Sequence, residues 1–298
     1  MYVIIHSFFC DKNNKVKTKL IRILLLIIIF ICFATIFTGS FILPRIIATN
    51  NVYINLNNTP EQENIKIAFI SDTHVGRYKK TNFIQNVADK IEQLEPDVLI
   101  LGGDLIFKRG EYAIYLEPLA KLTNKFPVYA VFGNHESNQG FLNDPRRKDK
   151  SQQLRTLFAN WNIKILENEN EIIKINDQEI AILGTKELWT DEVDFEPTLK
   201  SLSSEIPKIL ISHNPDIIYN EKTSNIDLIL SGHTHAGQIA LPFIGPIPPV
   251  GTELGRDISS GLFKIEDTLL YISSGIGESG PRARLFTLPE IALINIDL

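Results

Sequence analysis

Five of the six histidines in this chain stand in short motifs that also contain Asp, Asn or Gly. Together with Gly103-Asp104, these motifs are Asp72-Thr73-His74, Gly133-Asn134-His135-Glu136, His213-Asn214 and Gly232-His233-Thr234-His235. Oxygen and imidazole donors without a thiolate are typical of catalytic sites for Mn, Fe or Zn, whereas closed structural zinc sites usually use cysteine. The residue types therefore predict a catalytic site that binds divalent metal ions.

Two divalent ions about 3.5 to 4 Å apart can clamp a phosphoryl group and turn a bridging water into a hydroxide that attacks in line. Asp104 is expected to bridge the ions, because it follows a central strand. His135 stands one position beyond the expected ligand Asn134, so its imidazole can protonate the leaving oxygen. Asp72 or another carboxylate is expected to fix the imidazole tautomer. The motifs thus predict phosphoester hydrolysis without a covalent enzyme intermediate.

Each motif on its own has an ordinary explanation. A single Asp-x-His occurs often by chance, and Gly-Asn-His can be a turn capped by its Asn. The joint occurrence of five motifs, each directly after an apolar run, favours the metal site over these explanations.

The motif residues follow short apolar runs that are typical of strands buried on both faces. These runs are residues 67–70, 98–101, 128–132, 208–212 and 228–231. Residues 81–94, 112–122 and 152–160 have the apolar spacing of helices. The alternation predicts an α/β fold with parallel strands. Ligands bind at the carboxyl ends of strands in such sheets, so all five motifs are expected at one edge.

The remaining pattern predicts further strands and loops. Strands are expected at residues 163–166, 171–175, 179–183, 261–265, 269–273 and 291–296, with a hairpin turn at 176–178 and a polar loop at 136–150. Asp72 with His74, and His233 with His235, are expected to point the same way, because alternate residues of extended backbone share a face.

Residues 23–43 carry no charge and are long enough to cross a bilayer as a helix. A buried core helix and a cleavable signal peptide ending near Thr38, Gly39 and Ser40 are the alternatives. Five basic residues precede the segment, and only Arg45 follows closely. The positive-inside rule then predicts a single-pass protein of the cytoplasmic membrane, with the body on the outer side.

Charge and cysteine content exclude some functions. Residues 1–50 hold six basic residues against one acidic residue, which leaves a net charge of −10 on residues 51–298. An acidic body argues against nucleic-acid binding. The only cysteines are Cys10 and Cys32, so the body has neither a disulfide nor thiol chemistry. The expected organisation is a basic segment at 1–22, a transmembrane helix at 23–43, a tether at 44–64 with at most an edge strand at 52–54, and a catalytic domain at 65–298.

With these motifs in place, the chain resembles the calcineurin-like metallophosphoesterase superfamily over residues 67–240. The resemblance implies a four-layer α-β-β-α sandwich that follows the transmembrane helix. It also implies that Asp72, His74, Asp104 and His235 bind one ion, and that Asp104, Asn134, His213 and His233 bind the other. His135 matches the catalytic histidine of that family.

Later segments resemble a bacterial branch of membrane-anchored or exported phosphodiesterases, which includes UDP-2,3-diacylglucosamine pyrophosphatases. They are residues 232–238, 275–281 and 284–291. Many relatives carry a polar residue after Gly-Asp, where this chain has Phe107. This difference is expected to change the shape of the pocket and not the metal site. Arg282 and Arg284 are expected either to contact a substrate phosphate or to lie in a solvated loop. The proline-rich residues 241–250 are expected to form a pocket wall or to dip toward the membrane.

The leading hypothesis is a membrane-tethered phosphoesterase with two metal ions that cleaves phosphodiester or pyrophosphate bonds. A lipid-linked or envelope substrate is expected, such as a UDP-lipid, although a UDP-lipid would require the body to face the cytoplasm. No nucleic acid or protein partner is predicted. The alternatives are a phosphoprotein phosphatase, for which the compact body offers no evident peptide groove, and a scaffold without activity, which the complete ligand set disfavours.

Overall fold

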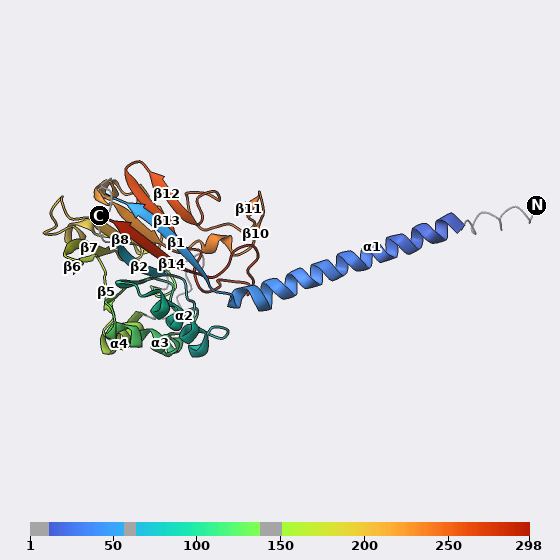
Figure 1. Cartoon of the computed structure of the whole chain (residues 1–298), viewed down its shortest axis with the longest axis horizontal. Helices are drawn as coiled ribbons and strands as arrows, with labels where there is room; N and C mark the ends of the chain where they lie inside the picture. The colour runs from blue at the N-terminus through green and yellow to red at the C-terminus, as the bar shows by residue number, and fades with distance from the viewer. Residues whose placement is uncertain (1–11, 57–63, 138–150) are drawn as a thin grey trace, which may run out of the picture.

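Two six-stranded sheets form the centre of the fold in the computed structural model, which describes residues 12–56, 64–137 and 151–298 (Figure 1). The first sheet has the order β1 (Ala48–Asn55), β14 (Glu290–Asp297), β2 (Ile65–Ile70), β3 (Val98–Gly102), β4 (Val128–Val131) and β5 (Lys164–Ile165). The second has the order β12 (Gly261–Ile265), β13 (Thr268–Ile272), β9 (Leu228–Ser231), β8 (Lys208–Ile211), β7 (Gln178–Gly184) and β6 (Glu169–Ile175).

Parallel strands occupy the middle of both sheets, as the apolar runs predict. The strands β2, β3, β4 and β5 are parallel neighbours, and so are β7, β8, β9 and β13. Antiparallel pairs lie toward the outside, where β14 meets β2, β6 meets β7 and β12 meets β13. The predicted α/β fold with parallel pairing is therefore confirmed.

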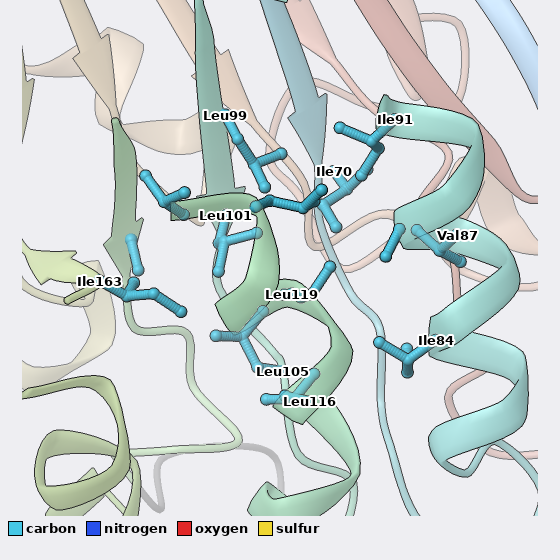
Figure 2. Packing of buried hydrophobic residues seen from close by; sticks show 14 of the residues in the cluster. Ile70, Ile84, Val87, Ile91, Leu99, Leu101, Leu105, Leu116, Leu119 and Ile163 are labelled. Atoms are coloured by element: carbon cyan, nitrogen blue, oxygen red, sulfur yellow. The ribbon is translucent and has the colours of Figure 1, made fainter. Parts of the chain in front are cut away.

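The fold has four layers, which are two sheets with helical segments on the outer face of each, and three apolar clusters pack between these layers. The helices α2 (Thr81–Leu94), α3 (Glu117–Ala120) and α4 (Ser151–Asn160) cover the outer face of the first sheet. Figure 2 shows this contact, in which Ile84, Val87 and Ile91 of α2 face strand residues such as Ile70. A second apolar cluster fills the space between the sheets, and a third lies under α5 (Phe195–Thr198) and the 3-10 turns η6 (Pro215–Tyr219) and η7 (Glu221–Asn225).

The predicted helix at 112–122 is helical but broken into three pieces. A 3-10 turn at Gly110–Leu116 precedes α3, and another at Lys121–Asn124 follows it. Pro118 lies in the first turn of α3, where its missing N–H ends the hydrogen bonding of the preceding turn. Most of the predicted loop at 136–150 lies outside the described residues.

The segment expected to be a tether is a full strand at the edge of the first sheet. β1 pairs in parallel with β14 along its whole length, and Val52 and Ile54 point into the core between the sheets. The folded body therefore begins at Ala48 rather than at Ile65. The abundance of Asn hides this strand in the sequence, because its polar side chains fall on the exposed face of an edge strand.

The helix α1 (Lys12–Phe37) extends away from the body (Figure 1), and with the turns η1 (Thr38–Ile42) and η2 (Leu43–Arg45) it is long and apolar enough to cross a membrane. The base of the helix is fixed to the body by hydrogen bonds. Arg284 N donates to Gly39 O over 2.9 Å, and Lys79 Nζ donates to Pro44 O over 2.7 Å. The body and the helix base thus form one structural unit.

Candidate metal centre

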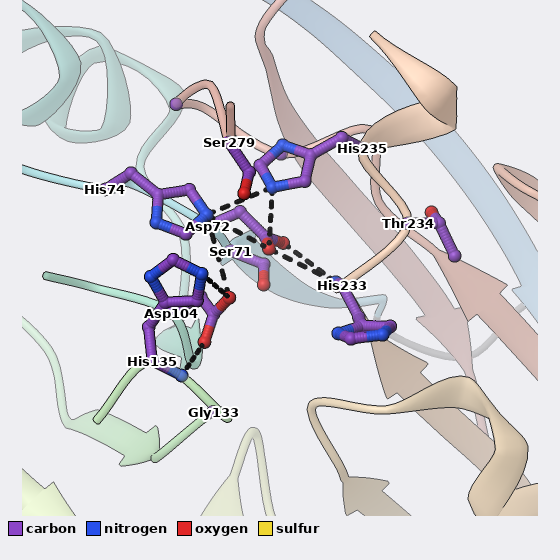
Figure 3. A network of polar contacts seen from close by, with 12 residues as sticks. Ser71, Asp72, His74, Asp104, Gly133, His135, His233, Thr234, His235 and Ser279 are labelled. Atoms are coloured by element: carbon purple, nitrogen blue, oxygen red, sulfur yellow. Dashed lines mark hydrogen bonds and ion pairs between the residues drawn. The ribbon is translucent and has the colours of Figure 1, made fainter. Parts of the chain in front are cut away.

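The predicted ligands come together where the carboxyl ends of both sheets meet. Figure 3 shows five of them, which are Asp72, His74, Asp104, His233 and His235. Asp72 and His74 follow β2, Asp104 follows β3, and Asn134 follows β4 in the first sheet. His213 follows β8, and His233 and His235 follow β9 in the second sheet. Hydrogen bonds across the sheets fix these loops, for example from His233 N to Asp72 Oδ2 over 3.0 Å.

The ligands share a face through left-handed backbone and not through extended backbone. Asp72, His74, Asp104, His233 and His235 all have φ between 42° and 70°. Such angles are rare for residues with a Cβ and cluster at functional sites, where the surrounding structure enforces them. The expectation that alternate residues of a strand supply these pairs is therefore wrong in its backbone geometry.

Two motif glycines are required by the close approach of the ligand loops. A Cβ on Gly133 would lie 2.3 Å from Asp104 Oδ1, and one on Gly232 would lie 2.3 Å from Asp72 Oδ2. Either added Cβ would displace one of these two carboxylates. The glycines of the motifs therefore make room for the acids.

The first group of donors contains Asp72, His74 and His235, whose donor atoms lie within 4.8 Å of one another. His74 Nε2 lies 3.0 Å from His235 Nε2, and His235 Nε2 lies 3.3 Å from Asp72 Oδ1. Burial and His74 hold the pKa of His235 well below its usual range, so its imidazole is neutral and can bind a cation.

The second group surrounds Asp104. His213 Nε2 lies 3.4 Å from Asp104 Oδ2, and His74 Nε2 lies 3.6 Å from the same oxygen. His233 Nδ1 lies 3.1 Å from Asn134 Oδ1. Asp104 is thus next to imidazoles of both groups, as its expected bridging role requires.

The protonation pattern of these histidines fits a divalent cation. A carbonyl oxygen only accepts, so Nδ1 of His213 donates to Gly102 O over 2.7 Å and Nε2 of His233 donates to Gly251 O over 3.1 Å. The other nitrogen of each ring then faces an oxygen of Asp104 or Asn134. Two acceptors at such distances repel each other unless a proton or a metal ion lies between them.

The charged groups of the site determine which of its side chains are protonated when no cation is bound. Burial lowers the pKa of His213, but the nearby Asp104 and Asp72 outweigh burial and hold this pKa well above its usual range. Burial and the nearby Asp104 raise the pKa of Asp72 to about 6, with His213 opposing this rise. A metal ion held by His213 would therefore compete with this proton, as it does at imidazole ligands in general.

His135 differs from the ligands in exposure and in its hydrogen bonds. Its side chain is 21% exposed and lines the pocket, whereas Asp104 is buried. His135 Nδ1 donates to Phe107 O over 2.9 Å, so this carbonyl fixes the tautomer instead of the expected carboxylate. His135 Nε2 lies 3.9 Å from Asp104 Oδ2. Phe107, the residue that departs from the pattern of relatives, stacks against the His135 ring.

Glu136, the last residue of its motif, and Trp189 have roles at the site that the motif pattern does not predict. The buried carboxylate of Glu136 accepts from Ile106 N over 2.8 Å and from Gly133 N over 3.0 Å, so it ties the loops after β3 and β4 together. Trp189 packs edge-on against His233 and lines the pocket. Trp189 lies in the loop after β7. Because ligand sites gather at the carboxyl ends of parallel strands, this position after a predicted strand could have identified it from the sequence.

A pocket of about 390 Å³ opens over His135, His233 and His235. One wall is formed by Gln238 and Ser279, whose loops are joined by reciprocal hydrogen bonds between the Gln238 amide and the Ser279 backbone. Pro248 and Pro249 form part of another wall, which agrees with one of the two roles expected for residues 241–250.

The two arginines expected at the substrate have different positions. Arg284 is fully buried, and its Nη2 donates to the carbonyls of Ser274, Gly275 and Gly277. Neither a phosphate contact nor a solvated loop is compatible with this burial, so Arg284 supports the loop instead. Arg282 is half-buried, stands over the ring of Tyr78, and does not line the pocket at the metal centre.

Buried carboxylate and imidazole donors at the joint edge of two packed sheets define a metal-dependent hydrolase. The model of the calcineurin-like phosphoesterase family matches residues 65–237, and the chain belongs to this family. It is therefore a hydrolase that acts on phosphoesters, as the motifs and the resemblance predict.

Three relatives illustrate the family. The chain is 29% identical to an uncharacterized metallophosphoesterase of Campylobacter jejuni over 82% of this chain and 66% of that protein. It is 28% identical to the phosphodiesterase YaeI of Escherichia coli over 78% of this chain and 82% of that protein. It is 24% identical to the UDP-2,3-diacylglucosamine pyrophosphatase LpxG of Chlamydia muridarum over 78% of this chain and 83% of that protein.

Proposed function

We propose that this chain is a membrane-tethered phosphoesterase with two metal ions that hydrolyses phosphodiester or pyrophosphate bonds in a lipid-linked substrate. The observation that carries the proposal is the position of the pocket beside the base of α1. Ser279 and Pro281 line the pocket, and the same loop continues to Arg284, whose N–H donates to Gly39 O. A lipid substrate can therefore reach the metal centre from the bilayer.

The donor set supports two ions that share one carboxylate. Asp72, His74, Asp104 and His235 would hold one ion, and Asp104, Asn134, His213 and His233 would hold the other. Divalent ions supply a hydroxide near neutral pH when they are bound in such pairs. Mn, Fe and Zn all suit these oxygen and nitrogen donors.

His135 is the residue we propose for proton transfer to the leaving oxygen. Its Nδ1–H is held by Phe107 O, which leaves Nε2 to carry or release the transferred proton. The ring is stacked on Phe107 and partly exposed to the pocket, so it can meet substrate. We assign no direct substrate contact to Arg282 or Arg284.

The names of two relatives support the substrate class. YaeI is a phosphodiesterase, and LpxG cleaves the pyrophosphate of UDP-2,3-diacylglucosamine, a UDP-linked lipid. A phosphoprotein phosphatase is the weaker candidate, because the pocket of about 390 Å³ suits a small phosphoester better than a folded protein surface. A scaffold without activity is weaker still, because all seven ligand positions are retained.

The test uses the full-length protein in detergent with added Mn and bis-p-nitrophenyl phosphate. We expect hydrolysis that a chelator abolishes, and a decrease of roughly 10²- to 10⁴-fold for His135→Ala with the metal content unchanged. Equal loss of metal in His135→Ala would contradict its role in proton transfer. A panel with UDP-diacylglucosamine and other lipid phosphates then identifies the substrate, and inactivity of metal-loaded protein on every phosphoester would favour the scaffold.

We propose that the body lies on the outer side of the cytoplasmic membrane. The basis is the five basic residues between Lys12 and Arg22, which open α1 and precede its uncharged stretch, since cytoplasmic flanks of such helices are enriched in Lys and Arg. Protease added to intact cells should digest the body. Protection of the body in intact cells, with digestion after lysis, would reverse the orientation and favour a cytoplasmic UDP-lipid substrate.

A further inference from the structure

A small hairpin beside the pocket exposes a cluster of large apolar side chains. The strands β10 (Ala240–Leu241) and β11 (Gly245–Pro246) are antiparallel, and residues 241–247 form what we call the hairpin tip. Relative exposures there are 109% for Phe243, 61% for Ile244 and 43% for Ile247. Apolar side chains that gather at such exposure mark a surface for a partner or a membrane.

The backbone of the hairpin tip holds the aromatic ring outward. Phe243 has a φ of 66°, which is an uncommon conformation for a bulky residue. Conformations of this kind persist only where the surrounding structure enforces them. The ring of Phe243 is thus fully exposed at a position whose backbone conformation the hairpin imposes.

Hydrogen bonds connect the hairpin directly to the base of α1. Ala240 N donates to Leu285 O and Leu285 N donates to Gln238 O, each over 2.9 Å. The neighbouring Arg284 N donates to Gly39 O, at the end of the apolar helix. In Figure 1, β10 and β11 lie on the side of the body from which α1 leaves. The hairpin tip and the helix are thus held on the same side.

The remaining residues around the helix base suit a bilayer surface. Arg45, Arg77 and Lys80 are exposed and line a second pocket at the end of the helix, together with the exposed ring of Tyr78. Basic side chains meet lipid phosphates, and aromatic rings favour the zone between headgroups and acyl chains. Docking of a protein partner would not explain why basic and aromatic side chains surround the base of an apolar helix.

We propose that the hairpin tip inserts into the bilayer as a second membrane contact beside α1. Phe243 and Ile244 enter the lipid, and the flanking Pro248 and Pro249 hold the pocket mouth at the membrane surface. The proposal rests on the membrane tether of the proposed function, and it adds a fixed orientation of the active site toward the lipid. A substrate then reaches the metal centre without leaving the bilayer completely.

The test measures the surroundings of single spin labels in the full-length protein in nanodiscs of phosphatidylcholine and phosphatidylglycerol. A nitroxide is attached at Phe243→Cys after Cys10→Ser and Cys32→Ser have removed the native thiols. The matched control is Ile172→Cys in β6, an apolar residue on the far side of the body (Figure 1) that is 42% exposed, close to the 43% of Ile247 in the hairpin tip. We expect the label at 243 to meet dissolved oxygen more than a water-soluble nickel complex, and the label at 172 to show the reverse.

The native Cys32 in α1, labelled after Cys10→Ser, separates the two proposals. A lipid environment at Cys32 with a water environment at 243 would overturn the hairpin contact and leave the tether intact. A water environment at Cys32 would overturn the tether itself. Protection at 243 that persists in detergent without lipid, together with dimerisation, would assign the hairpin to a second copy of the chain instead.

A kinetic experiment tests the consequence for substrate access. Phe243→Asn removes the apolar ring, and Asn tolerates positive φ, so folding should be preserved. We expect at least about a fivefold decrease in hydrolysis of a lipid phosphodiester in nanodiscs, because one Phe side chain contributes about tenfold or more to a water-to-lipid equilibrium. Hydrolysis of bis-p-nitrophenyl phosphate should not change, and Ile172→Asn should change neither rate. Equal rates for Phe243→Asn and the unaltered protein on the lipid substrate would contradict the proposal.

Discussion

Replacing Arg284 with Met is expected to destabilise the catalytic body and to loosen the metal centre. The guanidinium is fully buried, and burial lowers its pKa only to about 10, so it is charged at neutral pH. Its Nη2 serves three carbonyls, those of Ser274, Gly275 and Gly277. Methionine keeps much of the side-chain length and removes every donor, together with the charge that faces Glu278, whose Oε1 lies 4.0 Å from Arg284 Nε.

The expected magnitude follows from the carbonyls that lose their partner. A buried acceptor without a partner costs about 1 to 3 kcal/mol. Gly275 O still accepts from Glu290 N, so two carbonyls are left without a partner, at a cost of at least about 2 kcal/mol. For a body of this size each kcal/mol corresponds to roughly 2 to 4 °C, so the melting temperature should fall by at least about 4 °C. The same loop donates from Gly277 N to Asp72 O over 2.6 Å, so metal affinity should fall as well.

The assay is thermal unfolding of the metal-loaded protein in detergent, together with metal content after dialysis. Arg282→Met is the matched control, because Arg282 is on the same loop and contacts the rings of Tyr78 and Phe41. Losing these cation–π contacts should cost only about 0.5 to 1 kcal/mol. If Arg284→Met kept its melting temperature and only raised the KM for substrate, the buried structural role would be refuted and a phosphate contact would be the better explanation.

Three further predictions concern the metal centre and the helix base. Asp104→Asn should lower both metal content and the rate on bis-p-nitrophenyl phosphate by at least about 10- to 100-fold, because its carboxylate faces imidazoles of both donor groups; normal metal content would contradict its bridging role. Metal affinity, measured by calorimetric titration, should rise with pH, because the raised pKa of His213 lets a proton compete with the metal at lower pH; a pH-independent affinity would argue against His213 as a ligand. Burial lowers the pKa of Lys79 from 10.5 to about 8, so the unfolded chain binds more protons between these values and stability should rise by about 3 kcal/mol across that window. Lys79→Met should remove this rise in the free energy of unfolding, measured with denaturant at each pH. An unchanged dependence of stability on pH would show that burial does not lower the pKa of Lys79.

Much of the fold was predictable because local pattern and function coincide in the same segments. The runs before Asp72, Asp104 and His213 are apolar on both faces, which identifies central parallel strands without knowledge of their neighbours. The turn at Asn176 and Asp177 was also predictable, since both residues take the positive φ that a two-residue hairpin requires.

Other elements failed to show in the sequence because their partners are far away along the chain. The strand β1 is polar on its exposed face, and only pairing with β14, more than 200 residues later, identifies it. The left-handed backbone of His233 and His235 lets His233 N donate to Asp72 Oδ2 while the His235 ring reaches Asp72 Oδ1. No local pattern specifies such a turn, so extended backbone was the natural and incorrect expectation.

The sequence by itself determined the chemistry of this protein, because the donor atoms and the strands that present them are encoded within short segments. Only the tertiary structure decided what surrounds that chemistry. Arg284 could not be recognised as a buried support, since its partners become carbonyls of a folded loop. The hairpin tip could not be located beside α1, since only folding joins Leu285 to Gln238 and Arg284 to Gly39. Long-range contacts of this kind depend on how the whole chain packs, and local residue types do not encode them.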